Sequence, residues 1–235
     1  MPHVIARVVR YAMLVIAFLV GSLSMVFGTT SSPVPFQPAI AGYRYDFPKD
    51  HGSHPVYRTE WWYYTGHLRS KSGRSFGFEL TFFRRGVPPE EIKTLPSKWS
   101  ISHLYLAHFA VTDINGKRFH FSEKFSREGL GKAGADESQL RVWIDDWRAE
   151  ASTDPTGSHT LMAHDETHAL ALTLQPAKPL VTHGAAGISR KGKDVGQASH
   201  YYSFTRLATT GSLTIDGEQF EVSGISWMDH EFGSA

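Results

Sequence analysis

The chain has 235 residues, of which 41% are hydrophobic and 13% aromatic, and this is enough for one sizeable core. Its 24 basic and 23 acidic side chains give a net charge of +1, which excludes the basic field typical of nucleic-acid binding, so we expect no nucleic-acid partner. The absence of cysteine excludes disulfides, thiolate metal sites and a cysteine nucleophile.

Residues 1–28 predict a secretory signal peptide or a membrane anchor. Arg7 and Arg10 precede a run without charge that extends from Tyr11 to Gly28. A basic segment followed by an apolar one is typical of a signal peptide, but its length is also close to that of a membrane span. We expect the body of the protein to be periplasmic or secreted, either free or anchored in the inner membrane through residues 11–28.

Residues 29–42 predict a linker, and residues 43–235 predict a β-rich domain. The linker carries three prolines among serines and threonines, a composition that does not support regular structure. The domain contains runs such as "RSFGFELTFF", residues 74–83, in which phenylalanine and leucine alternate with other residues. This period of two is typical of a β-strand.

Turn signals between such runs predict antiparallel hairpins. Asn115-Gly116 and Asp216-Gly217 each separate two strand-like runs, as expected for two-residue primed turns, and a third turn is expected near Asp165. Glycine-rich residues 129–138 and 184–197 predict long loops, and only residues 88–95 favour a short turn of helix. We therefore predict an all-β antiparallel barrel or sandwich, preceded by the N-terminal signal or anchor helix.

The segment "EWWYYTGHL", residues 60–68, predicts a strand that is aromatic on both faces. Alternation places Trp61 and Tyr63 on one face and Trp62 and Tyr64 on the other, together with Glu60. The second face must be covered or must line a cavity. The strand is therefore either central between two packed layers or one wall of a pocket for an apolar ligand. On the second interpretation, the candidate ligand-binding residues are Glu60, Trp61, Trp62, Tyr63 and Tyr64.

Histidines near this segment raise the question of a metal. Asp50, His51 and His54 lie close together, and His103 and His108 follow on a later strand. Their spacing matches none of the common zinc signatures. We expect no metal here, and we expect these side chains to cap loops and satisfy buried polar groups.

The C-terminal segment "SGISWMDHEFG" contains a candidate general acid. Alternation places Trp227 and Asp229 on the same face of the predicted strand. A carboxyl beside an indole in an apolar setting has its neutral form favoured by desolvation. The alternative is an acidic strand end whose carboxylate binds turn amides.

Two long motifs, "FPKDHGSHPVYRTEWWYYTGHL" and "SGISWMDHEFG", resemble the AttH-like proteins that are grouped with hydroxyneurosporene synthase, the carotenoid 1,2-hydratase (CrtC) family. The resemblance covers roughly residues 43–235. It implies a lipocalin-like, all-β architecture, normally followed by a second β-barrel domain. On this resemblance, the chain corresponds to the N-terminal part of a longer product or to a truncated member.

The resemblance also implies catalytic residues. An aromatic-x-Asp pair supplies the acid in the hydratases, and Trp227 and Asp229 match it; an upstream His-x-aromatic pair is matched by His200 and Tyr202. Tyr202 stands where the hydratases favour tryptophan, and Trp227 where they favour tyrosine. Because of these two departures, the resemblance does not imply a carotenoid substrate.

We thus expect acid-catalysed hydration of a C=C bond in an apolar isoprenoid or lipid, without cofactor or metal. Asp229 would donate the proton, Trp227 and Tyr202 would face the cation, and His200 would orient Asp229 or the water. The alternative is a non-catalytic periplasmic carrier of lipids or other hydrophobic ligands. Hydrolysis by a serine nucleophile is disfavoured, because no G-x-S-x-G motif occurs in the sequence.

Overall fold

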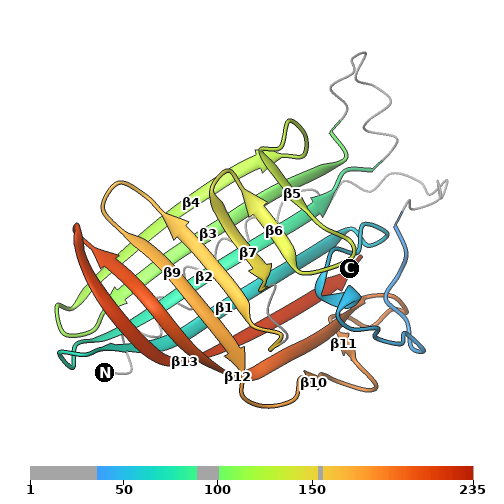
Figure 1. Cartoon of the computed structure of the whole chain (residues 1–235). Helices are drawn as coiled ribbons and strands as arrows, with labels where there is room; N and C mark the ends of the chain where they lie inside the picture. Colours follow the sequence, from blue (N-terminus) through green and yellow to red (C-terminus); the bar gives the residue numbers. More distant parts are fainter. Residues whose placement is uncertain (1–35, 89–100, 153–155, 235) are drawn as a thin grey trace. The chain divides into compact units, whose positions relative to one another are not determined.

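Thirteen β-strands make up nearly all the regular structure of the computed structural model, which describes residues 36–88, 101–152 and 156–234 (Figure 1). The predicted signal or anchor at 1–28 lies outside these ranges, as do residues 29–35 of the predicted linker and residues 89–95 of the predicted helical turn. Within the described ranges, no helix has the length and hydropathy of a membrane span.

The strands are long in the first and last thirds of the domain and short between them. A short 3-10 helix, η1 (Lys49–His51), precedes β1 (Thr59–Ser70), β2 (Ser75–Gly86), β3 (His103–Asp113), β4 (Arg118–Arg127), β5 (Ala133–Ala135), β6 (Arg141–Ile144), β7 (Trp147–Ala151), β8 (His159–His164), β9 (Ala169–Pro176), β10 (Val181–Thr182), β11 (Ile188–Arg190), β12 (Ala198–Ile215) and β13 (Glu218–Gly233).

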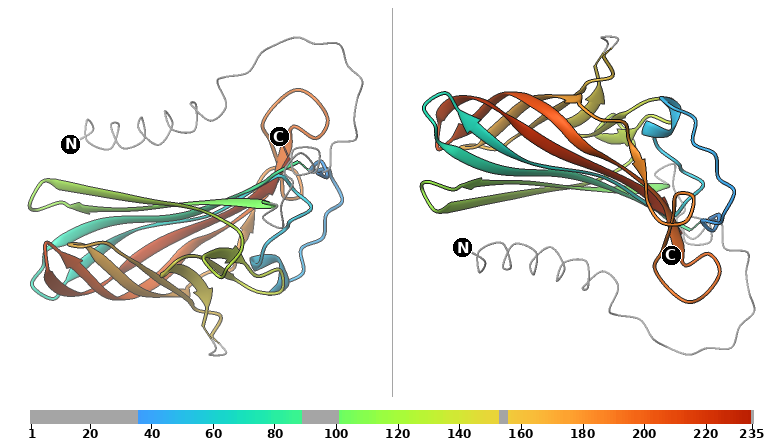
Figure 2. Two further views of the ribbon diagram at one scale, coloured as in Figure 1. Left: turned by 90° about the horizontal axis from the view of Figure 1, so that it is seen from above. Right: turned by 90° about the horizontal axis from the view of Figure 1, so that it is seen from below.

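All strands belong to one antiparallel sheet that curls into a nearly closed barrel. Its order is β4-β3-β2-β1-β13-β12-β9-β8-β7-β6-β5, and β10 and β11 pair with β12. β4 and β5 end this order, and β4 contacts β5 and β6 across the remaining gap, which we call the seam (Figures 1 and 2). The predicted all-β class is confirmed, and of the two predicted architectures the structure has the barrel and not the sandwich.

Alternation along the strands separates an inner face from an outer face. In β1 the even-numbered residues Glu60, Trp62 and Tyr64 are buried, whereas the odd-numbered Trp61 and Tyr63 are half-buried. The register of β1 with β2 and β13 extends these two faces across the sheet. The inner face carries the hydrophobic core, so the double-sided aromatic pattern reflects a packed interior and a partly covered exterior.

The two dipeptide turn signals have different outcomes. The Asp216-Gly217 prediction is confirmed, because both residues have positive φ, 50° and 80°, as a two-residue type I′ turn requires. The hairpin predicted at Asn115-Gly116 is confirmed, since β3 pairs with β4, but the predicted two-residue turn is wrong. Four residues connect β3 to β4, and the positive φ, 54°, falls on Lys117. The Asp113 carboxylate accepts a hydrogen bond from the Gly116 N–H at 2.9 Å and stabilises this longer turn.

The predicted loops at 129–138 and 184–197 are more ordered than expected. Each contains a three-residue strand, β5 in the first and β11 in the second. β5 pairs with β6, and β11 pairs with the start of β12. Both strands pair with the segment that follows them in the chain, so each loop contains a short hairpin that the glycine-rich composition does not reveal.

Gly224 allows β13 to approach β1 closely. A Cβ atom there would lie 2.0 Å from the His67 carbonyl oxygen, whereas a Cβ atom at Gly77, on β2, would meet its nearest neighbour at 3.7 Å. We expect Gly224→Ala to lower the free energy of unfolding by about 1–3 kcal/mol, since the strands must move apart. Gly77→Ala is the matched control and should be nearly neutral. Urea denaturation of both variants measures the difference, and equal stabilities would contradict the expected clash.

Candidate functional site

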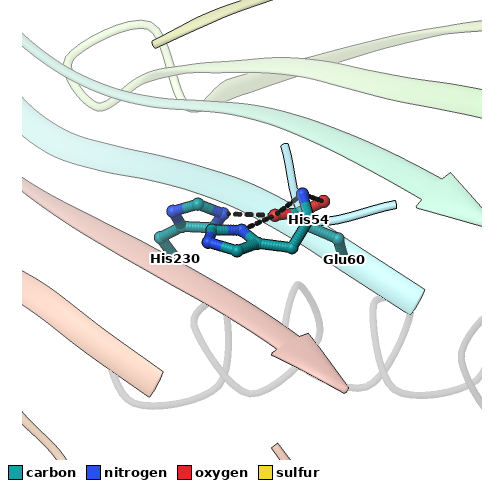
Figure 3. A group of neighbouring side chains, drawn as sticks. All are labelled: His54, Glu60 and His230. Atoms are coloured by element: carbon teal, nitrogen blue, oxygen red, sulfur yellow. Dashed lines mark hydrogen bonds and ion pairs between the residues drawn. The ribbon is translucent and has the colours of Figure 1, made fainter. Parts of the chain in front are cut away.

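A charged cluster surrounds Glu60 on the inner face. The Glu60 carboxylate accepts hydrogen bonds from Ser53 Oγ (3.0 Å), His54 Nδ1 (2.7 Å), Arg84 Nε (3.0 Å) and His230 Nε2 (2.8 Å). Figure 3 shows His54 and His230 converging on this carboxylate from the segment before β1 and from β13. Glu60 and Arg84 are both fully buried, so the cluster joins the 50–58 segment to three strands through one buried anion.

Hydrogen bonds and charges set the protonation of this cluster. Burial raises the pKa of Glu60, but hydrogen bonds from His230 and His54 outweigh it and hold that pKa well below 4.5. Burial likewise lowers the pKa of His54, but Asp50 and Glu60 raise it overall. Burial keeps the pKa of His230 below its usual value. The arrangement is therefore a glutamate anion balanced by Arg84 and His54.

His200 and Tyr202, two of the predicted catalytic residues, lie in this interior. The Tyr202 hydroxyl is hydrogen-bonded to His51 Nδ1 at 2.7 Å and His230 Nδ1 at 2.9 Å. The His200 ring packs 4.4 Å from the Tyr43 ring, and its buried Nδ1 has no hydrogen-bond partner among the described residues. Burial lowers the pKa of His200 to about 4. His200 is therefore a neutral core side chain.

Trp62 and Tyr64, two of the predicted ligand-binding residues, also belong to the packed interior. Trp62 donates from Nε1 to the His51 carbonyl at 3.1 Å and stacks on His230 at 4.9 Å between ring centroids. The Tyr64 hydroxyl is hydrogen-bonded to His159 Nδ1 at 3.0 Å. Both rings are at most 1% exposed, so they contribute to stability and to the support of the sheet.

Asp229 occupies the outer face, where it is half-buried. Its Oδ1 accepts hydrogen bonds from Tyr201 OH (2.9 Å), Trp227 Nε1 (2.6 Å) and Ser203 Oγ. Among the residues that the structure describes, none donates to Oδ2. Three donors therefore orient the carboxyl and leave one oxygen available to another molecule.

His183 extends this outer cluster. It follows β10, and its Nε2 lies 2.6 Å from Ser203 Oγ, while its ring stacks on Tyr201 at 4.0 Å. The result is a chain of hydrogen-bonding groups from His183 through Ser203 to Asp229. His183 could not be predicted from the sequence, because β10 and β12 meet only in the folded sheet and the local sequence carries no signal for that pairing.

A second carboxyl lies near Asp229 on the same face. Glu79 is opposite Thr65, which is opposite Trp227 on the next strand. Burial raises the pKa of Glu79, although a hydrogen bond from Thr81 opposes the shift. Burial, followed by the charges of Glu79 and Asp229, raises the pKa of Tyr63 to about 12. The Tyr63 hydroxyl is thus within electrostatic reach of both carboxyls.

Aromatic and apolar rows flank these polar groups. The register places Tyr201, Glu231, Trp61, Phe83, Leu106 and Phe125 in a cross-strand row on one side of Asp229 and Tyr63. Glu231 in this row is buried and paired with Lys191. Phe121 is 47% exposed and Phe125 is 68% exposed. The outer face therefore presents apolar rings around a line of polar side chains.

The structure divides the predicted site residues between the two faces. Trp61, Tyr63, Trp227 and Asp229 lie on the outer face, whereas Glu60, Trp62, Tyr64, His200 and Tyr202 lie on the inner face. The structure therefore does not bring His200 to Asp229. His183, Ser203 and Tyr201 surround Asp229 in its place.

The nearly closed antiparallel barrel is a lipocalin-like fold. Within that class, the chain belongs to the AttH-like family, whose model matches residues 38–235. This match confirms the family resemblance that the two sequence motifs predicted. No curated protein matches the chain.

Two solved structures share the fold. A Nitrosomonas europaea protein named as an AttH is 34% identical, with a TM-score of 0.75, over 85% of this chain and 59% of that one. Kievitone hydratase from Nectria haematococca is 13% identical, with a TM-score of 0.62, over 86% of this chain and 58% of that one. The chain thus spans about three fifths of the length of each.

Proposed function

We propose that this protein binds an apolar isoprenoid or lipid on the outer face and hydrates one of its C=C bonds by acid catalysis. The observation that carries the proposal is the pair of carboxyls, Glu79 and Asp229, on either side of Tyr63 on an aromatic surface. The segment at 1–28 supports activity in the periplasm or outside the cell. A kievitone hydratase shares the fold, which is consistent with a hydratase on this scaffold.

The environments of the two carboxyls suit different roles. Burial raises the pKa of Glu79 and so favours its protonated form, which is the form that can donate a proton. Asp229 acts as an acceptor for three donors through Oδ1, and this suits a group that receives a proton through Oδ2. The structure thus supports Glu79 as the donor, a role that the sequence analysis gave to Asp229.

The reaction then follows from these positions. Glu79 transfers its proton to one alkene carbon, and the electron pair of the double bond forms the new C–H bond. The rings of Trp227 and Tyr63 stabilise the carbocation at the other carbon. A water molecule adds to that carbon and passes a proton to Asp229, and proton exchange with solvent returns both carboxyls to their starting states. One water is added, and no electrons are exchanged.

Asp229→Asn tests this function. The whole chain and the variant are incubated with a panel of isoprenoid alkenes in water labelled with oxygen-18, and products are identified by mass spectrometry. We expect the wild type to incorporate the label and the variant to be slower by about 10²–10⁴-fold, since a positioned acid or base contributes about that much. A variant that incorporates the label at the wild-type rate would refute the assignment of Asp229.

A non-catalytic carrier is the second candidate, because the half-exposed aromatic rows on the outer face suit hydrophobic binding without chemistry. Extraction of apolar compounds from purified wild type and Asp229→Asn separates the two functions. We expect substrate to accumulate only on the variant if the protein is a hydratase. The same intact compound on both proteins, together with no incorporation of label, would identify a carrier.

A further inference from the structure

We propose that His120, Asp165 and His168 form a binding site for a divalent transition-metal ion such as Zn²⁺ at the seam of the barrel. One ligand atom from each of the three residues lies within 4.8 Å of the others. Two imidazoles and a carboxylate are a donor set that zinc and its neighbours in the first transition row accept. The site is separate from both clusters described above, and it does not depend on the proposed hydration.

The seam explains why such a site lies there. β4 and β5 end the strand order, so β4 meets the far side of the barrel through side chains. Ser122 Oγ donates to Asp165 Oδ2 at 2.5 Å, His120 Nε2 is hydrogen-bonded to the same oxygen, and Lys124 pairs with Asp146. A metal ion held by His120 and Asp165 would join β4 to the β8–β9 turn directly.

Backbone hydrogen bonds hold the Asp165 carboxylate in one orientation. Its Oδ1 accepts hydrogen bonds from the backbone N–H groups of Thr167 (2.9 Å) and His168 (3.0 Å), which leaves Oδ2 directed at β4. The turn therefore presents a carboxylate oxygen, an accepted zinc ligand, toward β4.

His168 supplies a second imidazole that the hydrogen-bond network uses only in part. Its ring stacks on that of His120 at 3.7 Å with an interplanar angle of 4°. Nδ1 bonds Thr167 Oγ1 at 2.8 Å, but Nε2 lies 3.8 Å from Asp216 Oδ1, beyond hydrogen-bond distance. Nε2 of His168 is therefore the ring nitrogen that can bind a metal.

A cavity beside the two histidines gives access for an ion and its water. It has a volume of about 200 Å³, and its polar lining consists of His120, His168, Asp113, Asp216 and Arg118, whose guanidinium is paired with both aspartates. Donor atoms around a tetrahedral zinc lie roughly 3.4 Å apart. His120 and Asp165 are partly exposed, and rotation of the His120 ring out of its stack on His168 would let both imidazoles direct a nitrogen at one ion beside the cavity.

The buried cluster around Glu60 also contains two histidines and a carboxylate, but neither histidine there has a free ring nitrogen. Both ring nitrogens of His54 are paired, with Glu60 at 2.7 Å and Asp50 at 3.3 Å. Both ring nitrogens of His230 are paired as well, with Glu60 at 2.8 Å and Tyr202 at 2.9 Å. A metal there would have to displace completed bonds in a filled core. At the seam it would also replace the His120–Asp165 and Ser122–Asp165 hydrogen bonds, but Nε2 of His168 has no hydrogen-bond partner among the described residues and a cavity adjoins both histidines, so we assign the ion to the seam.

Titration of the untagged whole chain with Zn²⁺, monitored by calorimetry and by thermal unfolding, tests the assignment. We expect one Zn²⁺ per chain and a rise in Tm with zinc concentration, since an ion that binds only the folded state stabilises it. Asp165→Asn keeps an oxygen for the turn amides but loses the charge. We expect it and His168→Gln to weaken binding at least about tenfold. His164→Gln removes an exposed histidine at the end of β8 and is the matched control.

Three results would overturn the proposal. The first is no binding by the wild type, and the second is equal binding by the wild type and all variants, which would indicate adventitious surface chelation. The third is binding that His54→Gln abolishes and His168→Gln leaves intact, which would move the ion to the Glu60 cluster. Circular dichroism of Asp165→Asn confirms that a loss of binding is not a loss of fold.

Discussion

Glu60→Gln is expected to lower the free energy of unfolding by about 3–5 kcal/mol, the largest effect on stability that we predict for a single substitution. The variant keeps the size of the side chain but removes the anion that faces Arg84, His54 and His230. Arg84 is then a fully buried cation that has lost the one carboxylate paired with it among the described residues, and its desolvation is no longer compensated. Urea denaturation near neutral pH measures the loss.

The pH dependence of the same variant gives an independent check. Because folding depresses the pKa of Glu60, its contribution to stability is present above the unfolded value of 4.5 and is lost as the pH falls through the folded pKa. The wild type should therefore lose stability on acidification more steeply than Glu60→Gln. Glu123→Gln, an exposed glutamate on β4, is the control and should change stability little. A loss below about 1 kcal/mol would show that Glu60 is not the centre of the cluster.

Glu79→Gln is expected to reduce the hydration rate by about 10²–10⁴-fold while the protein stays folded. Glutamine keeps the shape and can still accept the hydrogen bond from Thr81, but it has no acidic proton to transfer to the alkene. The readout is kcat/KM on whichever alkene of the panel the wild type hydrates. Glu221→Gln, an exposed position on β13 remote from the carboxyl pair, is the control.

The pH profile distinguishes a proton donor from a structural residue. Burial raises the pKa of Glu79, and only its protonated form can act, so the wild-type rate should fall as the pH rises through that pKa. The residual activity of Glu79→Gln should lack this fall. A variant with normal kcat/KM, or with reduced activity that follows the wild-type profile, would exclude Glu79 as the acid.

The strands and their two faces follow from sequence, because alternation is a local property. The burial of Trp62 and Tyr64 beside half-buried Trp61 and Tyr63 follows the predicted pattern. The separation of His200 from Asp229 is not local. It depends on the register that pairs Ser203 with Asp229 across β12 and β13, and no spacing within either segment reveals that register.

Glu79 and the seam site escaped prediction for a related reason. A single glutamate in an alternating strand indicates a solvent-facing side chain, and only neighbours from other strands bury it. His120 and Asp165 are 45 positions apart and meet because the short strands β5 to β7 leave part of β4 facing the β8–β9 turn. Closure of a barrel is a long-range event that motif spacing does not encode.

The seam also determines which strands of the barrel open first. Elsewhere around the circumference, neighbouring strands share ladders of backbone hydrogen bonds, but β4 is joined to the β6–β7 and β8–β9 turns by the ion pairs Lys124–Asp146 and His120–Asp165. The free energy of local opening is lowest where the fewest backbone hydrogen bonds must break. The three-residue β5 and the edge strand β4 should therefore exchange their amide hydrogens first, well before β1 and β13, and acid or a chelating agent should accelerate that opening.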